Sequence, residues 1–87
     1  MTIRKRAQAG TLQSSDLMVF VEPAAELTVE IESTVKQQFE HLIREKILEV
    51  LRAHGVTAGK VRIADRGALD YAIQARVETA LRRSGEA

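Results

Sequence analysis

The sequence contains no cysteine, a single proline, only three aromatic residues and a net charge of +1. Without cysteine the chain can form neither a disulfide nor a thiolate metal site, so cysteine pairing gives no information on its redox compartment. The scarcity of aromatics and the balanced charge argue against a nucleic-acid partner, which needs stacking platforms or a basic surface. No apolar run reaches the roughly 18 residues of a membrane span, and no signal-peptide core follows the basic start. We therefore expect a cytoplasmic protein with no nucleic-acid and no membrane partner.

The composition is that of a small globular domain. Hydrophobic residues make up 45% and charged residues 29% of the 87 positions, which is too apolar for a disordered chain. The length predicts one domain over residues 1–87, with a thin core. Residues 1–6 contain the basic cluster Arg4-Lys5-Arg6, and we expect this terminal segment to be disordered.

Short segments with strand-like patterns occupy most of the first third of the chain. Residues 17–21, Leu-Met-Val-Phe-Val, form an apolar run that Pro23 stops, which predicts a buried strand. Residues 27–32 and 60–64 alternate between apolar and polar side chains, the pattern of strands with one buried face. Residues 8–12 carry a weaker extended signal.

Two amphipathic helices are predicted from a change of period. A helix from Thr34 to His54 fits a capping box of Thr34 with Gln37 and a left-handed cap at Gly55. Its apolar stripe, expected to face the sheet, consists of Val35, Phe39, Leu42, Ile43, Ile47, Val50 and Leu51.

The second helix ends the chain. Its shared face consists of Leu69, Ala72, Ile73, Val77, Ala80 and Leu81, with Arg82 and Arg83 in the last turn and Gly85 beyond the end. The fold class is therefore predicted to be α+β: a mostly antiparallel sheet of three to four strands with both helices packed on one face.

Residues that could form a catalytic or metal site do not group in the sequence. His41 and His54 are thirteen residues apart on one helix, which is no metal-ligand spacing, and His54 is expected to complement the helix dipole. The glycines are scattered, so no phosphate-binding loop is present. Asp65 and Asp70 flank a short loop before a helix and are expected to act as caps. We predict no catalytic residues and no metal ligands.

The segment Gly10-Thr11-Leu12-Gln13-Ser14-Ser15-Asp16 is a cluster of turn-forming residues. Two interpretations of its serines stay open on the residues alone. They are ordinary turn residues, or one of them is an exposed hydroxyl that accepts a bulky covalent group. Without a catalytic set elsewhere, the sequence indicates a binding or carrier module.

The chain resembles the acyl carrier subunit of citrate lyase, the gamma subunit family. The resemblance runs in order from about residue 7 to residue 83, and its several motifs are separated along the chain. The matching segments are residues 9–18 (AGTLQSSDLM), 33–39 (STVKQQF), 47–51 (ILEVL), 65–70 (DRGALD) and 75–78 (ARVE).

The resemblance implies that Ser14 is the covalent attachment site, because the family's carrier serine sits in a Gly-Thr-Leu-x-Ser-x-Asp context. The implied cofactor is 2'-(5''-phosphoribosyl)-3'-dephospho-CoA, joined to Ser14 through a phosphodiester. In relatives the next residue is often glycine, whereas this chain has Ser15, which leaves a second hydroxyl beside the first. Asp16 is expected to cap the turn or to help the modifying enzyme recognise it.

The partners that the resemblance implies are the alpha subunit, an acyl transferase, the beta subunit, a citryl lyase, and a prosthetic-group transferase. The carrier would present acetyl and citryl groups on its thiol while citrate is cleaved to oxaloacetate and acetate, without supplying an acid or base. Two alternatives remain: the acyl carrier subunit of malonate decarboxylase, which uses the same type of arm, and an unmodified small interaction subunit.

Overall fold

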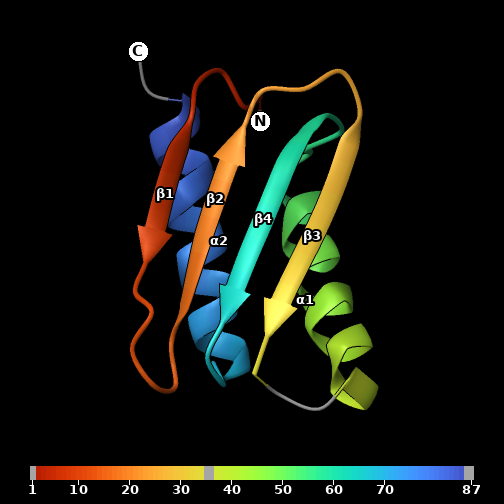
Figure 1. Cartoon of the computed structure of the whole chain (residues 1–87). Coiled ribbons are helices and arrows are strands. Elements are labelled where there is room, and N and C mark those ends of the chain that lie inside the picture. The colour runs from red at the N-terminus through yellow and green to blue at the C-terminus, as the bar shows by residue number, and fades with distance from the viewer. Residues whose placement is uncertain (1, 35–36, 86–87) are drawn as a thin grey trace.

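The computed structural model describes residues 2–34 and 37–85, and within these ranges the chain forms one sheet of four strands, a short 3₁₀-helix and two α-helices (Figure 1). In chain order they are β1 Ala7–Gly10, β2 Leu17–Glu22, β3 Leu27–Ser33, η1 Gln37–Phe39, α1 Glu40–Ala53, β4 Gly59–Asp65 and α2 Asp70–Gly85. The strands lie in the order β1-β2-β4-β3.

The predicted α+β class is confirmed, with one difference in the pairing of the strands. β1 with β2 and β2 with β4 are antiparallel, but β3 and β4 are parallel, so the sheet is mixed. The parallel pair is joined through α1, which lies behind the sheet in Figure 1 together with α2. In this arrangement the β3–α1–β4 crossover is left-handed, whereas about 98% of such crossovers are right-handed. The left hand keeps α1 on the same face as α2, where the two helices pack against each other.

Alternation along the strands places the core between the sheet and the helices. Leu17, Val19 and Val21 of β2 are buried, and the intervening side chains face the other side of the sheet. On that open side Phe20 pairs across the strands with Arg62, whose guanidinium lies 5.2 Å from the centre of the Phe20 ring. The helices contribute the other half of the core through Ile43, Ile47, Val50, Leu51, Ile73, Val77, Ala80 and Leu81.

The start of the first predicted helix is wrong, and so is the burial of its first turn. The α-helix begins at Glu40 rather than Thr34, and residues 35–36, which include Val35, lie outside the described residues. Phe39 is 46% exposed and Leu42 is 53% exposed. These two side chains line an open groove beside the turn that follows β4 instead of the core. The predicted left-handed cap at Gly55 is confirmed by its φ of 68°.

Both ends of the chain also differ from the prediction. Residues 1–6 were expected to be disordered, but Ile3 is buried, and the amides of Arg4 and Lys5 donate to the carbonyl oxygen of Ser84 at 3.0 and 3.2 Å. Burial of the apolar Ile3 side chain in the core is favourable, and it holds the N-terminal segment against the rest of the fold. Gly85 is the last residue of α2 rather than a residue beyond it. Neither α-helix is long and apolar enough to cross a membrane.

The two faces of α1 give a direct stability test. Ile47→Ala should lower the free energy of unfolding by about 2–5 kcal/mol, because its fully buried side chain would leave a cavity. Leu42→Ala should cost less than about 1 kcal/mol, because the side chain is half exposed. Urea titration of both variants measures the difference, and equal losses would contradict the placement of Leu42 outside the core.

Candidate functional site

The predicted attachment serine lies in the loop between β1 and β2, residues 11–16, which we call the Ser14 loop. The loop is entered through Gly10, whose φ is +101° and at which a Cβ atom would overlap the carbonyl oxygen of Leu17. Only glycine fits so tight an entry. The amide of Thr11 donates to that same carbonyl oxygen at 3.1 Å, which closes the hairpin below the loop. The Ser14 side chain is exposed at its outer surface.

Asp16 organises the inside of the loop. Its Oδ2 accepts a hydrogen bond from Thr11 Oγ1 at 2.6 Å, and its Oδ1 accepts one from the amide of Leu17 at 2.8 Å. Thr11 Oγ1 in turn accepts from the amide of Gln13 at 3.2 Å. The predicted capping role of Asp16 is therefore confirmed, since its carboxylate accepts from the first amide of β2 and Thr11 accepts from a loop amide.

A cation from the far end of the sequence holds this carboxylate. Arg76 of α2 donates from Nε to Asp16 Oδ1 at 3.1 Å and from Nη2 to Oδ2 at 2.9 Å, a two-pronged pair. The Asp16 side chain is only 16% exposed, so the pair is partly shielded from water. The hydrogen bonds from Arg76 are the main reason that the pKa of Asp16 falls to about 2, and the bonds from Thr11 and the Leu17 amide add to this against the opposing effect of burial.

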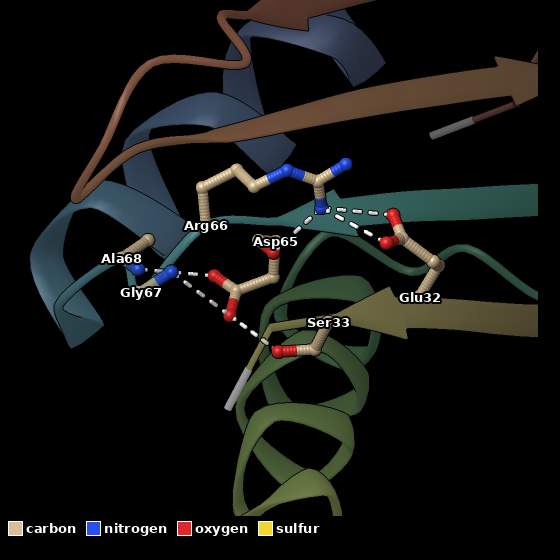
Figure 2. A network of polar contacts seen from close by, with 6 residues as sticks. All are labelled: Glu32, Ser33, Asp65, Arg66, Gly67 and Ala68. Atoms are coloured by element: carbon tan, nitrogen blue, oxygen red, sulfur yellow. Dashed lines mark hydrogen bonds and ion pairs between the residues drawn. The ribbon is translucent and has the colours of Figure 1, made fainter. Parts of the chain in front are cut away.

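The turn after β4 supports the other side of the loop. The amide of Ser15 donates to the carbonyl oxygen of Arg66 at 2.8 Å. The amide of Arg66 in turn donates to the carbonyl oxygen of Asp16 at 2.9 Å. The Arg66 guanidinium donates to the carbonyl oxygen of Asp65 at 2.9 Å and to both carboxylate oxygens of Glu32 at 2.9 and 3.1 Å (Figure 2). The loop therefore rests on a residue that is itself fastened to β3.

Asp65 is the centre of this turn, and it is fully buried. Figure 2 shows its carboxyl group accepting hydrogen bonds from Ser33 Oγ at 2.7 Å, from the amide of Gly67 at 3.2 Å and from the amide of Ala68 at 3.0 Å. The capping role expected of Asp65 is thus correct for the turn, but the bond to Ser33 also joins the ends of β3 and β4. Among the described residues no buried side-chain polar atom lacks a hydrogen-bond partner.

The predicted site residue and its neighbour differ in backbone geometry. Within the described ranges, no hydrogen bond engages the Ser14 hydroxyl, which leaves it accessible to a reagent. Ser15 has a φ of +65°, the only left-handed non-glycine residue among those described. In the loop that carries Ser14, the structure brings Asp16 together with Arg66 and Arg76, neither of which the sequence patterns predicted.

Arg76 had one signal in the sequence that was not used. It stands between the buried helix positions Ile73 and Val77, so an arginine borders the apolar face of α2. An arginine at such a border usually pairs with a carboxylate from a neighbouring element. The sequence contained no information on which carboxylate this was, because Asp16 lies 60 residues away. Elsewhere, the described residues hold no group of three side chains arranged to ligate a metal ion.

Comparison with known proteins identifies the family of this chain. Residues 4–84 match the family described as "ACP: Malonate decarboxylase delta subunit (MdcD)". The citrate lyase acyl carrier protein of Haemophilus influenzae strain PittEE is 49% identical over 84 residues, covering 97% of this chain and 88% of that protein. The protein of the same name from Treponema denticola is 44% identical over 86 residues, 99% of both chains.

A solved structure shows the same fold. The crystal structure of a Pseudomonas malonate decarboxylase hetero-tetramer in complex with malonate contains a chain that superposes with a TM-score of 0.78 at 28% identity. The superposition covers 95% of this chain and 87% of that one.

The matching family and the names of these relatives define the class of this chain, a carrier protein rather than an enzyme. The chain belongs to the family of the citrate lyase acyl carrier proteins. It is a carrier subunit, not a catalytic one.

The Asp16–Arg76 pair predicts a pH-dependent contribution to stability. The pKa of Asp16 is about 2 in the folded chain, compared with an ordinary value of 3.8. The stability that the pair contributes is therefore complete above pH 3.8 and is lost as the pH falls towards 2. Allowing for the partial exposure of Arg76, Asp16→Asn should cost about 1–2 kcal/mol at pH 7 and about half as much at pH 3. Urea titrations at both pH values measure this. In an Arg76→Gln background Asp16→Asn should cost much less, and a cost independent of both pH and Arg76 would refute the assignment.

The left-handed conformation of Ser15 predicts a stabilising substitution. Ser15→Gly should raise the free energy of unfolding by about 0.5–1 kcal/mol, because relief of the left-handed strain exceeds the extra backbone entropy of glycine in the unfolded chain. Ser14→Gly is the matched control, since Ser14 does not have a positive φ and should gain nothing. Thermal unfolding of both variants measures this. A gain for Ser15→Gly alone indicates strain at residue 15, whereas equal effects of both would show only that the loop tolerates glycine.

Proposed function

We propose that Ser14 is the attachment site of a phosphoribosyl dephospho-CoA arm and that the chain is the acyl carrier subunit of a citrate lyase. The observation that carries the proposal is the state of Ser14: an exposed hydroxyl, without a hydrogen bond among the described residues, on a loop held from both sides by Arg76 and Arg66. Membership of the acyl carrier family, with relatives named for citrate lyase, supports the same conclusion.

The residues around Ser14 fit a large anionic substituent. A group on the Ser14 oxygen can leave the surface without displacing core, because residues 12–15 are all exposed. A phosphodiester on Ser14 would stand two residues from Asp16, but Arg76 already balances the charge of that carboxylate. The left-handed Ser15 and its bond to Arg66 orient the loop, so Ser14 is presented in a defined direction.

The arm would supply a terminal thiol on which acyl groups are carried while partner subunits convert citrate to oxaloacetate and acetate. The contribution of this chain is to position and tether. Attachment makes each transfer effectively intramolecular, which raises the local concentration of the acyl group at the catalytic subunits. The proposed partners are the acyl transferase subunit, the citryl lyase subunit and the transferase that attaches the arm.

A second candidate function is the acyl carrier role in malonate decarboxylase. The matching family is described by that enzyme's delta subunit, and the structural neighbour is a malonate decarboxylase assembly. The same Ser14 loop would serve either enzyme, so the two are distinguished by the partner subunits. Higher identity to the proteins named for citrate lyase, 49% against 28%, favours the first.

The attachment site is tested by mass. In the native host, the wild-type chain and Ser15→Ala should carry the added mass of the arm, whereas Ser14→Ala should fold normally and carry none, because it lacks the oxygen that forms the phosphodiester. Intact mass spectrometry with peptide mapping measures this. Added mass on Ser15, or added mass that persists in Ser14→Ala, would show that the site is wrong.

The same proteins separate the two enzymes. The modified chain should restore citrate cleavage when mixed with the other citrate lyase subunits, Ser14→Ala should not, and the chain alone should release no oxaloacetate. Restoration of malonate decarboxylation by its subunits instead would select the second candidate.

A further inference from the structure

The large hydrophobic side chains that remain exposed all gather at one end of the described structure. They are Leu12, Phe39, Leu42, Leu69 and Tyr71. They belong to the Ser14 loop, to η1 with the first turn of α1, and to the start of α2, which lie together at the lower end of the molecule in Figure 1. Exposed hydrophobic groups that cluster in this way mark a contact surface.

A groove of about 200 Å³ runs through this end, between the starts of the two helices and the turn after β4. Its walls are apolar side chains of Phe39, Leu42, Ile43, Ala68 and Ile73, with Asp70 among the lining residues. Gly67, which also lines it, has no heavy atom within 4 Å of the place where a Cβ would stand, so this part of the groove is open. The groove is therefore a shallow channel whose exposed lining is about equally apolar and polar.

The groove is adjacent to the support of the Ser14 loop. Arg66, which holds the loop through the Ser15 amide and the Asp16 carbonyl oxygen, is flanked in the chain by Asp65 and Gly67, which both line the groove. A substituent on Ser14 thus leaves the protein next to the turn that forms one wall of the channel.

The size of the groove suits a tethered chain rather than a free ligand. Pockets that bind free small molecules measure about 300–1,000 Å³, and this one is smaller. A tether supplies an effective concentration on the order of millimolar, so even weak apolar contacts are enough to occupy the groove. The chain of a CoA-like arm alternates methylene groups with amides, which matches a lining that is about equally apolar and polar.

We propose that this groove holds the chain of the covalent arm between transfers, an inference that rests on the proposed attachment at Ser14. Phe39 and Leu42 form its apolar wall and lose exposure when the arm lies down. Leu69 and Tyr71, which are not among the lining residues, stay exposed. The bound arm keeps its thiol close to the surface, and the thiol becomes fully accessible when the arm swings out.

Nuclear magnetic resonance of the isolated chain tests the groove without any enzyme activity. Spectra of the unmodified and arm-carrying forms, each verified by intact mass, are compared in the absence of other subunits. The Leu42 methyl signals and the Phe39 ring signals should shift on modification, and the Tyr71 ring should not. The arm thiol should react several-fold more slowly with a disulfide reagent than the thiol of free coenzyme A.

Two substitutions make the comparison specific. Leu42→Asp should restore the thiol reaction rate to that of free coenzyme A, and Leu42→Ala should do so in part. Tyr71→Ala, the matched control on the same end of the molecule, should leave the rate unchanged. Both sites are more than half exposed, so the variants should fold.

The outcomes separate the two proposals. A chain that carries no added mass in its host refutes the attachment, and the groove proposal with it. A chain that carries the arm but shows no shift at Phe39 and Leu42 leaves the attachment standing and overturns the groove. Shifts at Leu42, Leu69 and Tyr71 that appear only when a partner subunit is added would also overturn it, and would identify this end as a protein-docking surface.

Discussion

The buried carboxyl group of Asp65 is the interaction on which the rest of this molecule depends. It accepts hydrogen bonds from β3 and from two amides of the turn that follows β4, and so it joins the ends of the two parallel strands. An apolar residue of similar size would take this acceptor away from the part-buried amides of Gly67 and Ala68, at a cost of roughly 1–3 kcal/mol each. The position of Arg66 follows from this turn, and the Ser14 loop is hydrogen-bonded to Arg66.

The Ser14 loop is therefore held in place by segments that are distant from it in the sequence. One side is held by α2 through Arg76, and the other by the turn after β4. Both supports use charged side chains or backbone groups beneath the loop. Its outer surface, which includes Ser14, therefore stays exposed. This division suits the attachment proposed at Ser14, because an attached group needs freedom while its point of attachment needs a defined place.

Patterns in the sequence predicted the helices and strands well, but they predicted poorly which elements lie side by side. Alternation identified β3 and β4, and the glycine at position 55 identified the end of α1, because these signals are local. The parallel pairing of β3 with β4 was missed, since local periodicity does not say which strands meet. Phe39 and Leu42 continue the helical stripe in sequence but lie where no sheet covers them, so periodicity alone placed them wrongly in the core.

For the site, the resemblance to a family selected Ser14, whereas the physical pattern left it as one turn residue among several. The pairing of Asp16 with Arg76 needed the structure, because only the fold brings residues so far apart into contact. The left-handed backbone at Ser15 could not be predicted from the sequence either, because a serine does not indicate that conformation as a glycine does.

The reliance of the loop on Arg76 has a consequence for the order of events in the cell. Residues 11–16 leave the ribosome early, but α2, which begins at Asp70, is made last. Chain synthesis proceeds at about 5–20 residues per second, so the loop spends several seconds without its anchor. A transferase that required the braced loop, as the proposed attachment would allow, would act only after α2 has been synthesised, so shorter nascent chains would not be modified.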